Sequence, residues 1–408
     1  MRISGVVKGR IGKILVVLAY LLLFFLCTEL FYRQSINYTG GYPSDLADHI
    51  RFALDDNVTK YSILLPVFKL LYHINGTTFY IAMLLSIMVC GTVNMTFRLI
   101  RYFVPKLNDF VVQVFAFAVN LVTPFYIPSL NSHRYLGLLS GTIWHNPTYT
   151  AMKFLAVAVL VVFFRIYFKK EKANICDWIL LYVLLCVVTI IKPNFVLAFA
   201  PAVAILALID IIRKEIKWGK VFALGCSFLP AALVLLFQYN VLYNNNDGSG
   251  LGFSFGYVIG HYAEHPFAAI VQSVVFPILV LAANIKSLKK DKAYLLSWVM
   301  WGIALLQYLC LIETGGRHLH GNWGWGVLFA TFILFVASIN RLMQNILELQ
   351  EFKKPRKNGE PVLPAFAPAP PVAVLRNIYY AITGLVFVLH FYFGIRWLWI
   401  IIHGGHYI

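Results

Sequence analysis

The chain has 408 residues, of which 60% are hydrophobic and only 12% are charged. Soluble domains carry about twice that share of charged residues, so the composition excludes an ordinary water-soluble enzyme. The formal net charge of +17 would suit a nucleic-acid-binding protein, but the positions of the lysines and arginines along the chain favour a different explanation.

Apolar segments recur from one end of the chain to the other, each about as long as the 20 residues that a helix needs to cross a bilayer. We therefore predict an all-α polytopic membrane protein with about eleven spanning helices. The predicted spans lie near residues 14–32, 78–97, 108–128, 149–168, 176–191, 194–212, 221–239, 268–285, 294–312, 324–343 and 377–402. The six cysteines lie in or beside these segments without metal or redox spacing, and we interpret them as small hydrophobic residues.

Three regions describe the predicted domain organisation. Residues 1–354 form the transmembrane catalytic domain, residues 355–375 form a proline-rich cytoplasmic linker, and residues 376–408 hold the last spanning helix. The first apolar segment follows a short basic stretch but lacks a small-residue cleavage site, so we interpret it as a retained span. No soluble domain and no internal repeat is predicted.

The lysines and arginines set the expected orientation. Most of the 34 fall in connecting segments that alternate spans place on one side, and such an excess marks the cytoplasmic side. The N-terminus is then cytoplasmic and the C-terminus extracytoplasmic, in the plasma (inner) membrane. The positive charge is thus a consequence of topology, and we expect no nucleic-acid partner.

With this orientation, the unusual polar segments all lie in extracytoplasmic loops. The first loop contains GYPSDLADHI, residues 41–50, in which Ser44 can cap a helix with Asp45 in its first turn. Asp45, Asp48 and His49 are three and four positions apart, so they are expected on one helical face. Carboxylates and an imidazole at a membrane surface suit a catalytic site, although a capped surface helix explains the same pattern.

An apolar stretch at 61–75 follows and is predicted to lie along the membrane interface. Two later loops hold residues suited to an anion. Pro147 can occupy the first turn of a helix whose N-terminal amides bind an anion, next to Trp144 and Asn146. Lys192 joins two apolar segments, where a lysine is costly unless it reaches the interface or pairs with an anion. An ordinary helix start and an interfacial lysine remain alternatives.

The segment 313–326, ETGGRHLHGNWGWG, is the polar stretch richest in glycine and histidine. Arg317 offers a planar fork that suits phosphate. His318 and His320 can bind a metal ion, but their spacing with one glutamate is a loose pattern, so we predict phosphate binding and no metal or other cofactor. The loop at 240–267 is rich in asparagine and glycine, and either forms a lid over the site or is a plain flexible loop.

These motifs resemble those of the integral-membrane type-C glycosyltransferases (GT-C), and in particular of bacterial members that build surface polysaccharide. The stretches that carry the resemblance are YPSDLADHI after the first span, WHNPT, KPNF and ETGGRHLHGNWGWG. The resemblance implies a multi-span helical fold with an acidic motif in the first extracytoplasmic loop. It also implies a polyprenyl-phosphate-linked sugar donor, a glycan or lipid-linked acceptor, and inversion at the anomeric carbon.

Within that family, Asp45 and Asp48 are the candidate catalytic residues. We prefer Asp45 as the general base, because the amide dipoles of a first helical turn favour its ionised form. Binding of substrate and lipid phosphate is assigned to His49, Trp144, Asn146, Lys192, Arg317, His318, His320 and Asn322. Two other functions fit the pattern, namely a polysaccharide polymerase or ligase with a lipid-pyrophosphate donor, and a lipid or oligosaccharide transporter.

Overall fold

The computed structural model describes residues 5–37, 40–58, 60–168, 173–243, 250–352 and 373–406. Nearly all regular structure in these ranges is helical. The α-helices are α1 Gly5–Ile36, α2 Leu46–Leu54, α3 Leu64–Asn75, α4 Phe79–Phe103, α5 Asp109–Val119, α6 Pro147–Phe168, α7 Ile175–Ile191, α8 Asn194–Ile212, α9 Trp218–Tyr243, α10 Tyr257–Tyr262, α11 Pro266–Ser273, α12 Val275–Asn284, α13 Lys292–Cys310, α14 Gly324–Phe352 and α15 Ala373–Ile402.

The remaining regular elements are short. There are two 3₁₀ helices. The first, η1 Ile285–Lys289, follows α12, and the second, η2 Gly315–Arg317, precedes α14. Strands β1 Leu251–Phe253 and β2 Leu311–Glu313 pair antiparallel, so that Leu251 lies opposite Glu313. The small sheet therefore joins the loop after α9 to the loop after α13.

Eight of the described helices are long and apolar enough to cross a membrane. The pair α11 and α12, bent by 68°, makes a ninth if it is counted as one span. The prediction of an all-α polytopic membrane protein is confirmed, whereas the predicted number of about eleven spans is not. Two of the predicted spans are shorter apolar helices, α5 and α7. In α5 the helix ends at Val119, and the apolar chain continues without helical structure.

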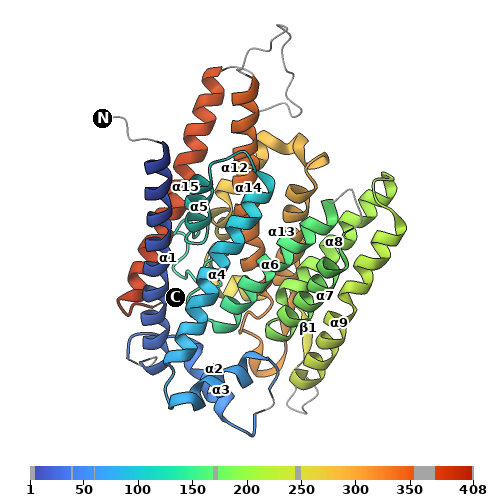
Figure 1. Ribbon diagram of the computed structural model, residues 1–408. Helices are drawn as coiled ribbons and strands as arrows, with labels where there is room; N and C mark the ends of the chain where they lie inside the picture. Colours follow the sequence, from blue (N-terminus) through green and yellow to red (C-terminus); the bar gives the residue numbers. More distant parts are fainter. Residues whose placement is uncertain are drawn as a thin grey trace.

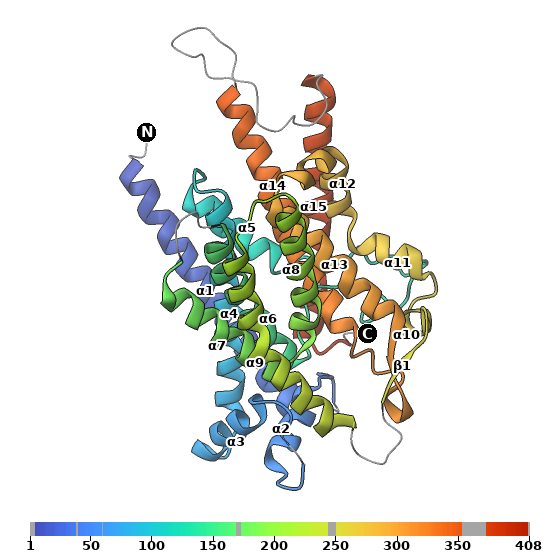
Figure 2. The same ribbon diagram turned by 90° about the vertical axis from the view of Figure 1, so that its right-hand side faces the viewer.

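The long helices form a bundle with two distinct ends (Figure 1). Helices α2 and α3 lie across one end, at the bottom of Figure 1, and the start of α1 lies at the other. The turned view in Figure 2 shows the same separation. Helix α14 is central, because 89% of its spanning window is buried, against 22% in both α9 and α15. We call the two ends the α2–α3 end and the opposite end.

The first loop folds as two short helices, as the sequence indicates. Helix α3 covers most of the stretch predicted to lie along the interface. Helix α2 begins at Leu46, so that Asp45 is its N-cap residue and not part of its first turn. The Ser44 hydroxyl accepts a hydrogen bond from the Leu46 amide at 3.1 Å. Leu46, Ile50 and Ala53 are buried and hold α2 on the bundle.

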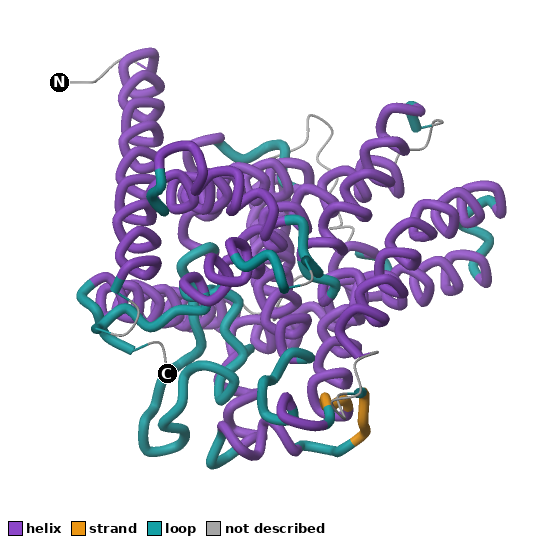
Figure 3. Tube along the Cα trace, turned by 90° about the horizontal axis from the view of Figure 1, so that it is seen from below, coloured by secondary structure: helices purple, strands orange, loops and turns teal. Residues whose placement is uncertain are grey.

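Between α5 and α6 the chain runs through the bundle without helical structure, and we call residues 120–146 the extended segment. Irregular backbone at membrane depth is tolerated only where protein surrounds it and satisfies its polar groups. Side chains of α6 do so at Gly141, whose carbonyl accepts hydrogen bonds from Tyr149 and Lys153, both at 3.0 Å. The Tyr308 hydroxyl donates to the Leu136 carbonyl at 2.8 Å. Figure 3 shows loops of the α2–α3 end passing between the helices.

Some sequence predictions fall partly outside the described residues. Residues 355–372 of the predicted linker lie outside the described residues, and α15 begins at Ala373. Residues 244–249 of the predicted lid also do so, while the rest of that loop holds β1 and α10.

Candidate functional site

The junction between α7 and α8 places Lys192 at the centre of the candidate site. Helix α7 ends at Ile191, and the lysine side chain turns inward between α6 and α14. Its Nζ donates a hydrogen bond to Thr148 Oγ1 at 3.1 Å. The same nitrogen lies 4.2 Å from the centre of the Trp325 ring, as in a cation–π contact. The lysine is therefore held at a defined position and not simply extended toward the membrane interface.

Asp45 is held against the segment that precedes α6. Its backbone N–H donates to the His145 carbonyl at 3.0 Å, and its Oδ2 accepts a hydrogen bond from Asn146 Nδ2 at 2.6 Å. The Ser44 hydroxyl donates to the same His145 carbonyl at 2.7 Å. Two motifs a hundred residues apart, YPSD and WHN, are thus joined directly by hydrogen bonds.

Asn146 fixes the orientation of this contact because it also caps α6. Its Oδ1 accepts hydrogen bonds from the Tyr149 amide and the Thr148 hydroxyl, both at 2.8 Å. The amide nitrogen must then point away from the helix, toward Asp45. The result is a continuous hydrogen-bonded path from Asp45 through Asn146 and Thr148 to Lys192. The carboxylate and the amine are linked by two neutral side chains.

A second carboxylate, Glu313 at the end of β2, also interacts electrostatically with the lysine. It is only 4% exposed. Its two oxygens accept hydrogen bonds from the Tyr243 hydroxyl of α9 and the Asn322 amide. Asn194, at the start of α8, donates to the Asn322 carbonyl at 2.7 Å. The KPN and GNW motifs therefore meet beside Glu313.

Burial lowers the pKa of Lys192 to about 7, and the nearby carboxylates of Asp45 and Glu313 offset part of that effect. Neither carboxylate lies within ion-pair distance of the amine in the part of the chain that the structure describes. The lysine thus interacts electrostatically with two carboxylates, Asp45 and Glu313, without a direct ion pair to either. Near neutral pH it can gain or lose its proton.

Two histidines near the lysine are neutral at pH 7. Burial lowers the pKa of His49 to about 4, and the Lys192 charge acts in the same direction. Burial also lowers the pKa of His145 to about 4. The His145 ring packs edge-on against Tyr135, with ring centres 4.6 Å apart. Within the described residues, Nδ1 of His49 is buried and has no hydrogen-bond partner, so this atom can bind a substrate hydroxyl.

Arg317 approaches the site from η2. Its guanidinium group is near enough to the hydroxyls of Tyr61 and Tyr243 to interact with them electrostatically. The Tyr243 hydroxyl in turn donates a hydrogen bond to Glu313. Trp144 is 4% exposed and borders a separate cavity beside Lys153. The structure therefore gathers four of the predicted residues around Lys192, namely Asp45, His49, Asn146 and Asn322, whereas Arg317 lies near Tyr61 and Tyr243.

Besides Trp144, three predicted residues lie apart from this group. Asp48 is exposed on α2 and forms an ion pair with Arg51 at 2.9 Å, whereas Asp45 is the N-cap residue and accepts a hydrogen bond from Asn146. His318 is exposed, and its Nδ1 lies 2.9 Å from the Gly315 carbonyl. His320 is also exposed. Within the described ranges, no three His, Cys, Asp or Glu side chains come together as metal ligands would.

The sequence analysis did not assign Glu313, His145 or Tyr243 to the site. Glu313 carried a usable signal, because a carboxylate directly after an apolar span is costly to bury without a partner. His145 lies within the WHNPT motif, but the sequence alone does not indicate which residue it contacts. Tyr243 ends an apolar helix, and only the pairing of β1 with β2 brings Glu313 toward it.

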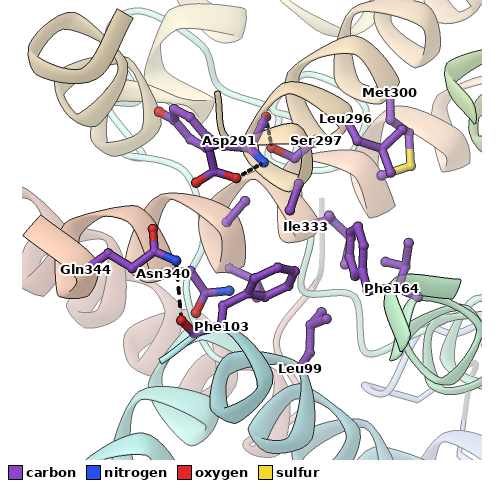
Figure 4. Close-up of a pocket in the computed structure, with 15 residues that line it drawn as sticks. Leu99, Phe103, Phe164, Asp291, Leu296, Ser297, Met300, Ile333, Asn340 and Gln344 are labelled. Carbon is purple, nitrogen blue, oxygen red and sulfur yellow. Dashed lines mark hydrogen bonds between the residues drawn. The ribbon is translucent and has the colours of Figure 1, made fainter. Parts of the chain in front are cut away.

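A separate cavity of about 30 Å³ lies near the opposite end, between α4, α6, α13 and α14 (Figure 4). Two of its polar side chains serve local structure, whereas the Tyr294 hydroxyl and Asn340 Oδ1 are buried without a hydrogen-bond partner among the described residues. Asp291 caps α13 by accepting a hydrogen bond from the Tyr294 amide at 3.0 Å, and Gln344 donates to the Phe103 carbonyl at 3.3 Å. Leu99, Ile333 and other apolar side chains form the rest of the wall. We place the candidate site at the α2–α3 end, because the polar motifs of the sequence meet there.

The group around Lys192 has the parts that acid–base chemistry on an anionic substrate requires. Asp45 can accept a proton, Lys192 and Arg317 can compensate negative charge, and neutral His49 can bind a hydroxyl. Elements from the whole length of the chain, α2, α6, α8 and β2, contribute to this group. In comparisons with known proteins, the sequence matches no family model and no curated protein.

Proposed function

We propose that the protein is a membrane glycosyltransferase of the GT-C type. It moves a sugar from a polyprenyl-phosphate-linked donor to a glycan or lipid-linked acceptor at the extracytoplasmic face of the plasma membrane. The acceptor hydroxyl oxygen forms a bond to the anomeric carbon, and the bond from that carbon to the phosphate oxygen breaks with its electron pair. Attack from the opposite face inverts the anomeric centre.

Asp45 acts as the general base in this proposal. A sugar hydroxyl is a poor nucleophile near neutral pH, and a positioned carboxylate can take its proton during the attack. The hydrogen bond from Asn146 to Oδ2 holds the carboxylate in place. Exposed Asp48 contributes to the position of Arg51 and not to the reaction.

The observation that carries the proposal is the state of Lys192. A half-buried ammonium group without an ion pair is costly, and among the described residues its only hydrogen bond is to the neutral Thr148 hydroxyl. A phosphate that arrives with the substrate would provide the missing counter-ion. It would also raise the pKa of the lysine, so that the positive charge is greatest when the leaving phosphate develops its own charge.

Binding of undecaprenyl phosphate tests the proposal without knowledge of the sugar. Transfer of any sugar from a polyprenyl-phosphate-linked donor leaves a lipid phosphate of this kind as product. Purified protein in nanodiscs should bind it, and Lys192→Ala should weaken the binding about tenfold or more, as loss of a charge-assisted hydrogen bond predicts. Asp45→Asn should leave this binding nearly unchanged. Equal binding by wild type and Lys192→Ala would remove the lysine from the phosphate site.

The orientation has its own test. A cysteine placed at Gly316, which is exposed in η2, should react with a membrane-impermeant thiol reagent added outside intact cells. A cysteine placed at Asn358, in the predicted cytoplasmic linker, should not. Reaction at Asn358 from outside would reverse the orientation and exclude an extracytoplasmic site.

A further inference from the structure

Two arginines from distant parts of the chain, Arg134 and Arg396, border one cavity between α15 and the extended segment. Helix α15 packs very closely on that segment. A Cβ atom at Gly394 would lie 1.6 Å from the Leu121 carbonyl oxygen, so only glycine is accommodated there. Phe393, Arg396 and Trp397 lie at positions i, i+3 and i+4, and all three border the cavity.

Among the described residues, the two guanidinium groups have no acidic partner. Arg134 stacks on the Tyr126 ring, with its Cζ 3.9 Å from the ring centre. Burial lowers the pKa of Arg134, and the like charge of Arg396 adds to that effect. Within the described residues, neither arginine forms an ion pair with a carboxylate. Two unpaired cations at one cavity form a site for an anion.

A third donor lies in the same wall. Trp397 is 2% exposed, and its buried Nε1 has no hydrogen-bond partner among the described residues. A buried N–H group is rarely left without an acceptor, because the loss of its hydration is then not compensated. The indole N–H and the two guanidinium groups together suit the several acceptor oxygens of one phosphate group.

The position of the cavity indicates that a lipid carries the anion. Helix α15 lies at the edge of the bundle, and its neighbouring side chains Ile395 and Trp399 are 40% and 66% exposed. Arg396 lies six residues before the end of α15 at Ile402, which corresponds to about 9 Å along the helix axis. An apolar chain can therefore follow the outer face of α15 while its headgroup reaches the arginines.

We propose that the cavity between α15 and the extended segment binds the phosphate-bearing headgroup of a membrane lipid. Arg134 and Arg396 hold the phosphate oxygens, Trp397 donates a further hydrogen bond, and the lipid chains lie along α15. This site is separate from Lys192. Tyr135, the residue after Arg134, packs against His145 and so lies between the two sites.

Lipid binding to the purified full-length protein tests this proposal. The probe is dioleoyl phosphatidic acid, titrated in detergent and measured by native mass spectrometry, with dioleoyl phosphatidylcholine and inorganic phosphate as comparisons. Wild type should bind phosphatidic acid most tightly. Arg396→Gln should weaken that binding about tenfold, as loss of a charge-assisted hydrogen bond predicts. Trp397→Phe should weaken it by a smaller factor, because only a neutral donor is removed.

Controls separate this site from general charge effects and from the proposed reaction. Arg33→Gln removes an arginine that already pairs with Glu29, and Asp45→Asn alters only the catalytic group, so both should bind phosphatidic acid as wild type does. Arg396 is exposed, and its variant should fold normally even where an Arg134→Gln variant does not. Unchanged binding in both Arg396→Gln and Trp397→Phe would overturn the proposal. Equally tight binding of inorganic phosphate would overturn the assignment to a lipid.

Discussion

Two lysines, one near each end of the bundle, show how the same residue type serves different purposes. Near the opposite end, Lys292 donates to Asp210 and to Glu215, both at 2.7 Å. At the α2–α3 end, Lys192 makes its hydrogen bond to a neutral threonine, and its carboxylates remain at longer range. The first lysine is neutralised within the protein, whereas the second retains the capacity to bind an anion.

The surroundings of Lys292 are those of a structural cross-link. Asp210 is 1% exposed and also accepts a hydrogen bond from the Tyr167 hydroxyl at 2.6 Å. Helices α6, α8 and α13 are thereby joined at one point. A little further along the same end, the buried Arg341 bonds to Asn345 and Glu348 of its own helix. Lys292 and Arg341 are thus both paired with carboxylates of the protein itself.

The largest effect on the rate of sugar transfer is expected at Asp45, at the same end of the bundle as Lys192. Because loss of a general base typically costs about 10²–10⁴ in rate, Asp45→Asn should bind donor almost normally and transfer sugar very slowly. Asp48→Asn, the matched control on the same helix, should lose much less, since its carboxylate is exposed. Single-turnover rates measure both. If Asp48→Asn alone abolished transfer, the roles of the two residues would have to be exchanged.

A smaller effect is expected for the cations. Lys192→Ala and Arg317→Ala should each weaken donor binding by roughly 10- to 100-fold, as the loss of hydrogen bonds to a charged group predicts. Arg317→Lys should recover only part of the loss, because its ammonium group lacks the bidentate fork. The matched variant Lys292→Ala should not alter donor affinity per folded molecule. A donor titration that found Lys292→Ala as impaired as Lys192→Ala would remove the distinction between the two ends.

For stability, the larger effect is expected at Lys292 and the smaller at Lys192. Lys292→Met leaves Asp210 buried without its cation, and loss of one partner from a buried pair costs roughly 3 kcal/mol or more. Lys192→Met removes a half-buried charge that has no ion pair among the described residues, so the free energy of unfolding should change by less than about 1 kcal/mol or increase. Denaturant titration in detergent micelles measures both. Strong destabilisation by Lys192→Met would show that its role is structural.

The smallest expected effect is a pH dependence of phosphate binding. The pKa of Lys192 is about 7, so the cationic form is lost as the pH rises from 6 to 9, and affinity for undecaprenyl phosphate should fall over that interval. Lys192→Arg should remove this dependence, since arginine stays charged. A transition near pH 6.5 that persisted in Lys192→Arg would implicate a histidine, contrary to the lowered pKa values of His49 and His145.

The same lowered pKa has a consequence for folding. The unfolded chain keeps this lysine protonated up to its ordinary pKa of about 10.5, whereas the folded protein releases the proton near pH 7. The unfolded state therefore binds more protons between these values, and the contribution of Lys192 to stability increases with pH across that range.

The sequence alone determined the features that depend on local composition. Long apolar segments predict spanning helices because a bilayer leaves backbone groups no other partner. The helices α2 and α3 also followed from local patterns, as did the start of α6 at Pro147. Lys192 could be singled out because its chemistry conflicts with its apolar surroundings, whatever the fold.

The end of α5, the different positions of Asp45 and Asp48, and the place of Glu313 in the site depend on tertiary structure. Hydropathy cannot separate a buried helix from a buried irregular chain, so the end of α5 at Val119 was not predictable. Spacing could not rank Asp45 against Asp48 by location, since only contact with Asn146 turns one inward and leaves the other exposed. Glu313 joins the site through pairing of β1 with β2. Each of these outcomes depends on contacts between residues far apart in the chain, which local sequence patterns do not encode.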